Sequence, residues 1–193
     1  MKKKLFALGL VSATVISTMG ATTAFASTPE GTGNTVVTYQ PDIVSPPDAT
    51  WAVSMPLHVT LNTSNEAVGA DEANKANSIH NNVGVALDFT IFDAGGSTTS
   101  HTSNDEVQVT LVSATDDGEI TMSGTGTATD TVKMALTKKD TGYIKKSDDT
   151  VGTLTNNNSD NTITAKAGIS TAPTTVKSGD KYSTELTFKF TQQ

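Results

Sequence analysis

The chain has 193 residues, no cysteine and a formal net charge of −7, with 20 acidic residues against 13 basic ones that are all lysine. This acidic balance disfavours nucleic acid and anionic membrane surfaces as partners, because both bind clustered positive charge. The lack of cysteine excludes disulfide bonds, thiol chemistry and a lipid-modified cysteine anchor.

The first 26 residues have the three-part pattern of a secretory signal peptide. Three lysines at positions 2–4 precede an apolar run over 5–16, and Ala24-Phe25-Ala26 supplies a small-x-small cleavage site. The apolar run is too short and too interrupted by Ser and Thr for a bilayer span of ~20 residues. We therefore expect an exported chain without a membrane span, organised as a signal peptide (1–26), a flexible leader (27–34) and a single domain (35–193).

The first strands are predicted around a proline-rich segment. TVVTYQ (35–40) predicts a strand, and PDIVSPPD (41–48) predicts a stiff turn whose prolines stop sheet pairing. WAVSMPLHVTL (51–61) alternates with period two, and Pro56 on its second face indicates an edge strand or a bulge. The residues expected on its core face are Trp51, Val53, Met55, Leu57, Val59 and Leu61.

The rest of the chain predicts one short helical region and many short strands. Residues 62–82 turn polar, and the spacing of Ala70, Ala73 and Asn77 allows one or two helical turns. Alternating apolar segments separated by Gly, Asn and Asp turns then follow, at 83–92, 106–112, 119–123, 131–137, 151–155, 162–169 and 182–190. They predict an all-β fold, an antiparallel β-sandwich of the Ig-like or a related Greek-key kind, with about eight to ten strands.

No pattern of catalytic, metal-ligating or cofactor-binding residues emerges. His58, His80 and His101 lie far apart in the sequence, with no partner at a ligand spacing. Carboxylate pairs such as Asp116-Asp117 indicate solvated turns. NNNSDN (156–161) lacks the central Gly and distal Glu of a calcium loop and predicts an Asn-rich hairpin turn.

Lysine–asparagine isopeptide chemistry would need a buried lysine beside a buried acid. Lys133, Lys189 and Asp88 all fall on the solvent-facing parity of their predicted strands. We therefore expect exposed charge at these positions. We predict no catalytic residue, no metal and no cofactor.

Two segments resemble secreted Gram-positive surface proteins. The closing GDKYSTELTFKFTQQ (179–193) is similar to the C-terminal motif of WxL-domain cell-surface proteins. Tyr182, Leu186 and Thr187 match that motif, while Phe188 and Phe190 stand where the family has Trp and Leu. In the opening strand the resemblance is carried by Trp51, Val53 and Pro56. The resemblance implies a secreted β-sandwich held non-covalently on the cell wall, with a role in adhesion or surface assembly.

We thus predict a non-catalytic, extracellular or cell-wall-associated protein. Its expected partners are cell-wall polymer, other surface proteins or further copies of itself, contacted through the loops at 62–82 and 138–161. The alternative is a self-assembling fibre or pilus-like subunit, in which residues 35–40 add to a neighbour's sheet edge. A secreted hydrolase is the least favoured alternative. The closing segment 182–190 is expected to be the last core strand, with Tyr182, Leu186, Phe188 and Phe190 facing the core.

Overall fold

The computed structural model describes residues 41–46, 49–67, 72–95, 100–125, 128–138, 142–175 and 180–193. The predicted signal peptide, the leader, the strand expected at 35–40 and Ala70 lie outside these residues. In the part of the chain that is described, no helix has the length and apolar character needed to cross a membrane.

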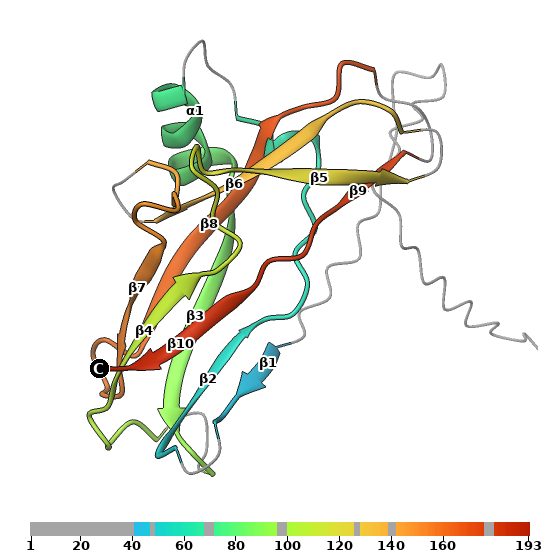
Figure 1. Cartoon of the computed structure of the whole chain (residues 1–193). Coiled ribbons are helices and arrows are strands. Elements are labelled where there is room, and N and C mark those ends of the chain that lie inside the picture. Colours follow the sequence, from blue (N-terminus) through green and yellow to red (C-terminus); the bar gives the residue numbers. More distant parts are fainter. Residues whose placement is uncertain are drawn as a thin grey trace, which may run out of the picture.

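The described residues form ten strands in two antiparallel sheets, which confirms the predicted all-β sandwich (Figure 1). In chain order the strands are β1 (Pro41–Val44), β2 (Trp51–Pro56), β3 (Val85–Asp93), β4 (Glu106–Leu111), β5 (Glu119–Thr125), β6 (Val132–Lys138), β7 (Thr150–Thr155), β8 (Thr162–Thr171), β9 (Lys181–Ser183) and β10 (Phe188–Gln192). The larger sheet has seven strands in the order β1-β2-β3-β8-β6-β5-β9. The smaller sheet has three, in the order β10-β4-β7.

The core lies between the two sheets and is built from the alternating residues of their strands. Leu87, Phe89 and Ile91 of β3 are buried, as the period of two predicts. They belong to one buried cluster with residues of the smaller sheet and of β6 and β8 in the larger one, including Val107, Val109, Leu111, Leu136, Leu154, Ala165 and Ala167. This confirms the predicted inward faces of β3, β4, β6 and β8.

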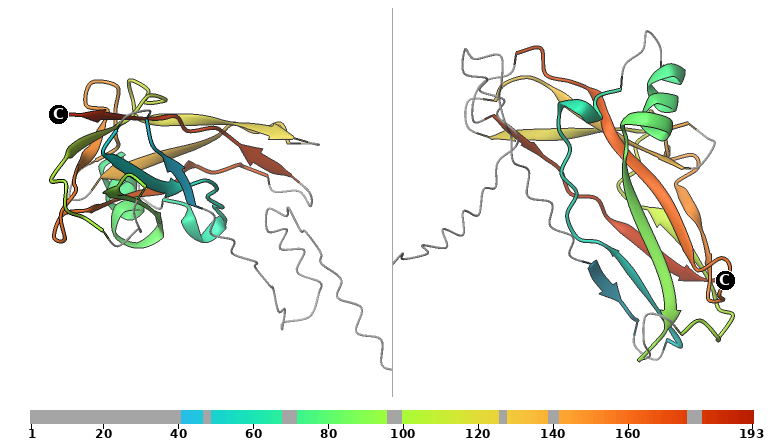
Figure 2. Two further views of the ribbon diagram at one scale, coloured as in Figure 1. Left: turned by 90° about the horizontal axis from the view of Figure 1, so that it is seen from below. Right: turned by 180° about the vertical axis from the view of Figure 1, so that it is seen from behind.

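The helical turns predicted within 62–82 are present. They comprise a 3-10 turn η1 (Thr63–Asn65), the helix α1 (Glu72–Ser78) and the π-helical turn η2 (Ile79–Val83). Ile79 is fully buried and lies so close to β8 that a Cβ on Gly168 would come within 2.8 Å of its Cγ1. Helix α1 therefore packs at one end of the molecule, opposite the end at which the chain finishes (Figures 1 and 2).

The turn predicted over 41–48 is wrong at its start. Pro41–Val44 form the edge strand β1, which pairs antiparallel with β2 and sets Pro41 opposite Pro56. An edge strand tolerates proline, because a missing N–H on its open side breaks no ladder bond. The predicted inward face of residues 51–61 also stops early: β2 ends at Pro56, and Leu57 and Val59 are 42% and 36% exposed.

The closing segment does not form one strand. It divides into β9, which pairs with β5 of the larger sheet, and β10, which pairs with β4 of the smaller sheet. The alternation still holds, since Tyr182, Leu186, Phe188 and Phe190 pack against the core and the residues between them are more exposed. β5 and β9 together leave the body of the sandwich as a projecting ribbon (Figures 1 and 2).

The Asn-rich turn at 156–161 is not a hairpin. β7 pairs with β4 in the smaller sheet, whereas β8 pairs with β3 and β6 in the larger one. The turn therefore carries the chain from one sheet to the other. Its first residue, Asn156, is 0% exposed.

Candidate functional site

At one end of the sandwich β2 and β4 begin and β3, β7 and β10 finish (Figure 1). Polar side chains gather at this end. Strand ends bring them together from both sheets, although they lie far apart in the sequence. We call this set the end cluster; its members are Thr50, Trp51, Asp93, Ser100, Thr102, Ser103, Asp105, Asn156 and Gln192.

One half of the end cluster is built on Asp93, the last residue of β3. Its carboxylate accepts five hydrogen bonds. The hydroxyls of Ser100 and Thr102 donate to Oδ2 at 2.6 and 2.8 Å. The backbone N–H groups of Thr102 and Ser103 donate to Oδ1, both at 3.2 Å, and Asn156 Nδ2 donates to the same oxygen at 2.6 Å. The donated hydrogen bonds, that of Ser100 first, hold the pKa of Asp93 well below its usual range.

Asn156 connects this loop to the smaller sheet. Its side-chain amide donates to Asp93 and, at 2.5 Å, to the hydroxyl of Ser103. Its backbone N–H donates to the carbonyl of Asp105, and its own carbonyl accepts from Asn104. Asn104 has a φ of 55°, in the left-handed region that asparagine tolerates better than most residues. The segment from Ser100 to Asp105 is thus held at both ends.

The other half of the end cluster is built on Asp105, directly before β4. The hydroxyl of Thr50 donates to Asp105 Oδ2 at 2.5 Å, and Gln192 Nε2 donates to Asp105 Oδ1 at 3.1 Å. The indole Nε1–H of Trp51 donates to Gln192 Oε1 at 3.2 Å. Trp51 is 2% exposed, which confirms its predicted place in the core, yet its polar edge reaches the terminal strand.

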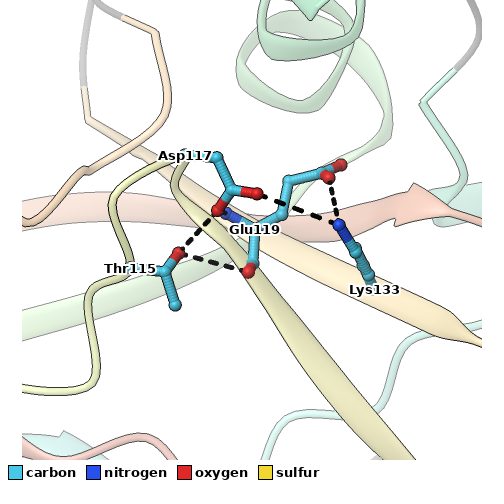
Figure 3. Close-up of polar contacts among 4 residues, drawn as sticks. All are labelled: Thr115, Asp117, Glu119 and Lys133. Carbon is cyan, nitrogen blue, oxygen red and sulfur yellow. Dashed lines mark hydrogen bonds and ion pairs between the residues drawn. The ribbon is translucent and has the colours of Figure 1, made fainter.

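A second polar group lies around β5 and β6 (Figure 3). Lys133 Nζ is 3.0 Å from Glu119 Oε2 and 3.8 Å from Asp117 Oδ2. The expectation of plain exposed charge is wrong for Lys133, because its side chain is only 30% exposed and that of Glu119 only 12%. β6 lies inside the larger sheet, between β5 and β8, so Lys133 has a paired residue on each side, Thr121 on β5 and Thr171 on β8.

The carboxylates beside Lys133 are ionised. Burial raises the pKa of Glu119, but the hydrogen bond and the charge of Lys133, together with Ser170 and the charge of Lys75, outweigh it and lower the pKa overall. The backbone N–H of Glu119 and the hydroxyl of Thr115 donate to Asp117 and lower its pKa. Amide formation with a lysine needs a neutral carboxyl group and a neutral amine. This arrangement is therefore an ion pair.

The residues that carry the sequence resemblance fall into two groups in the structure. Trp51, Val53 and Pro56 lie in β2, which starts at the end cluster. Phe188 and Phe190 lie in β10, with ring centroids 4.9 and 6.3 Å from that of Phe89. Leu186 and Thr187 lie in the link before β10, and Tyr182 lies in β9 on the projecting ribbon. A hydrogen bond from the indole Nε1–H of Trp51 to Gln192 Oε1 joins β2 to β10.

The histidines stay apart. His58 is exposed after β2, and His101 Nε2 lies 2.9 Å from the side-chain amide of Asn161. Among the residues that the structure describes, no three His, Asp or Glu side chains are grouped as metal ligands would be.

Sequence reasoning missed Asp93, Asp105, Asn156 and Gln192. Asp93 and Asn156 were predicted only as turn residues, and Asp105 and Gln192 fall outside the predicted strands. These four residues share one feature that the sequence does show, a place at or beside the end of a strand. Strand ends meet at the ends of a sandwich. Which end each one occupies depends on strand pairing, which the alternation of residues does not specify.

Comparison of this chain with protein-family models, with curated protein sequences and with solved structures returned no match. The similarity of the closing segment to WxL-domain proteins therefore stays a prediction from the sequence.

Proposed function

We propose that this chain is a non-catalytic secreted protein of the cell surface, associated with the cell wall, that acts in adhesion or surface assembly. The observation that supports this most is the Asp93 half of the end cluster. Four hydrogen bonds to Asp93 and one from Asn156 to Ser103 hold the 100–105 loop on the two-sheet scaffold. Loops fixed in this way present a constant surface, and β-sandwich proteins commonly bind through such loops.

Export and charge make the proposal more specific. The signal-peptide pattern of residues 1–26 predicts secretion. Because the chain is acidic, its expected partners are uncharged or positively charged regions of cell-wall polymer or of other surface proteins.

The edge strand β1 favours a second candidate, a self-assembling subunit that uses strand addition. Only four residues pair β1 with β2, and the open side of β1 is an edge of the larger sheet. A strand from another copy could take its place and pair with β2.

Fractionation of the producing cells tests the main proposal. We expect the processed chain in the cell-wall fraction, and we expect a variant with Asp93→Asn and Asn156→Ala, which frees the loop, to bind purified walls less well. The matched control is Asn158→Ala, in an exposed turn residue of the same end. Recovery of the folded wild-type chain only from the medium, with no binding to walls, would contradict the proposal.

Size-exclusion chromatography separates the two candidates. Strand addition predicts large assemblies that disappear when residues up to Val44 are deleted. A surface protein that acts as a monomer stays monomeric in both forms and keeps its binding to walls.

A further inference from the structure

The Asp105 half of the end cluster has the parts of a self-modifying acyl-transfer site. Thr50 supplies a hydroxyl group that donates a hydrogen bond to the carboxylate of Asp105. Gln192 supplies a carboxamide group whose nitrogen donates to the same carboxylate. A hydroxyl is a weak nucleophile until a neighbouring base takes its proton, and Oγ1 of Thr50 lies 2.5 Å from such a base.

The orientation of the Gln192 amide is fixed by its two partners. The indole N–H of Trp51 can only donate, so it faces the amide oxygen, and the carboxylate of Asp105 faces the amide nitrogen. The Trp51 donor is therefore aimed at the oxygen on which negative charge would develop if the carbonyl carbon were attacked. Donors placed in this way stabilise tetrahedral intermediates.

We propose that Thr50 and Gln192 form an intramolecular ester bond. Asp105 takes the hydroxyl proton as Thr50 Oγ1 attacks Gln192 Cδ, and the charge on Oε1 is held by Trp51 Nε1–H. The Cδ–Nε2 bond then breaks, and Asp105, already hydrogen-bonded to Nε2, returns the proton to it. The products are an ester and one molecule of ammonia, so the step needs no oxidant, reductant or further reactant.

The bond would join the two sheets covalently at one end. Thr50 directly precedes β2 of the larger sheet, and Gln192 is the last residue of β10 in the smaller sheet. Closing such a long loop lowers the conformational entropy of the unfolded chain and so stabilises the fold, as a disulfide does in proteins with cysteine. The inference rests on this geometry and does not depend on the proposed function.

Intact-mass spectrometry of the purified exported chain tests the proposal. We expect a mass lower than that of its sequence by one ammonia. Digestion after lysine should then yield residues 190–193 joined to the peptide that ends at Lys75. Hydroxylamine should separate the two, since it cleaves esters and leaves amides intact.

Four variants assign the roles. Thr50→Val and Gln192→Ala should keep the full sequence mass, Asp105→Asn should slow the mass loss by at least tenfold, and Thr50→Ser should retain it. Gln193→Ala is the matched control, because its side-chain amide donates to the carbonyl of Thr191, and it should lose ammonia as the wild type does. Circular dichroism checks that each variant is folded.

Two results would overturn the proposal. One is a wild-type chain that is folded and keeps its full mass after prolonged incubation at neutral pH, which would make the contacts a non-covalent clasp. The other is a loss of ammonia that persists in Thr50→Val.

Discussion

Two polar groups of this molecule keep their carboxylates ionised by different means. Asp93 is surrounded by neutral donors, namely hydroxyls, backbone N–H groups and an amide. Glu119 is held by the ammonium group of Lys133. An ion pair is weakened by salt, whereas hydrogen bonds from neutral dipoles respond to it much less. The stability that the Asp93 group contributes should therefore depend on hydrogen-bond geometry, and the stability that the Lys133–Glu119 pair contributes should depend on ionic strength.

Replacing Asp93 with Asn should have the largest effect. Asn offers one acceptor oxygen in place of two, so several of the five donors lose their partner. We expect a marked fall in the urea midpoint at neutral pH, together with proteolytic cleavage near residues 100–105.

The same variant tests the pH dependence. In the unfolded chain Asp93 gains a proton near its ordinary pKa of about 4, whereas the folded chain keeps it ionised to lower pH. The stability that ionised Asp93 contributes to the fold is fully present above its ordinary pKa. It is lost as the pH falls through the lowered pKa of the folded chain. Urea titrations at pH 7 and pH 3 should show that the free energy of unfolding falls less between these two pH values in Asp93→Asn than in the wild type. An unchanged loss would mean that other carboxylates govern acid unfolding.

Asn156→Ala should lower the free energy of unfolding by about 2–3 kcal/mol, because it removes a fully buried amide and the hydrogen bonds that this amide donates to Asp93 and Ser103. Thermal and urea unfolding measure it. Asn158→Ala, in an exposed residue of the same turn, should change stability little. Equal effects of the two would contradict the role given to Asn156.

Gly118→Ala should cost about 2 kcal/mol in the turn that positions Asp117 and Glu119. Gly118 has a φ of 81°, and a Cβ there would lie 2.6 Å from the Cβ of Tyr143. Gly95→Ala is the matched control, since its φ is 72° but no atom lies within 4 Å of an added Cβ. The destabilisation by Gly118→Ala minus that by Gly95→Ala measures the cost of the steric clash with Tyr143. Equal destabilisation by the two variants would contradict that clash.

Lys133→Met should have the smallest effect, about 1 kcal/mol at low salt, since its partially exposed ion pair is screened by solvent. The loss should shrink as sodium chloride is added. Lys146→Met, which removes a cation that is 71% exposed and 4.0 Å from Asp116, should change stability less. A loss that does not depend on salt would show that packing, rather than charge, holds Lys133.

The fold class was predictable because alternation reports burial one residue at a time. Leu87, Phe89 and Ile91 had to share a face, and they do. Pairing partners were not predictable in this way. The even alternation of residues 182–190 gave no sign that Tyr182 and Phe190 belong to different sheets. Pro41 was misjudged because the cost of a missing N–H depends on whether the strand lies at an edge.

The sequence by itself determined the acidic charge, the lack of cysteine and the inward faces of most strands, because each of these depends on residue type or on local periodicity. Only the tertiary structure decided that Thr50, Asp105 and Gln192 meet, and that Asn156 is buried against Asp93. These contacts join residues 55 to 87 positions apart. Such contacts depend on which strand ends come together when the two sheets pack, and no local pattern of residues encodes that choice.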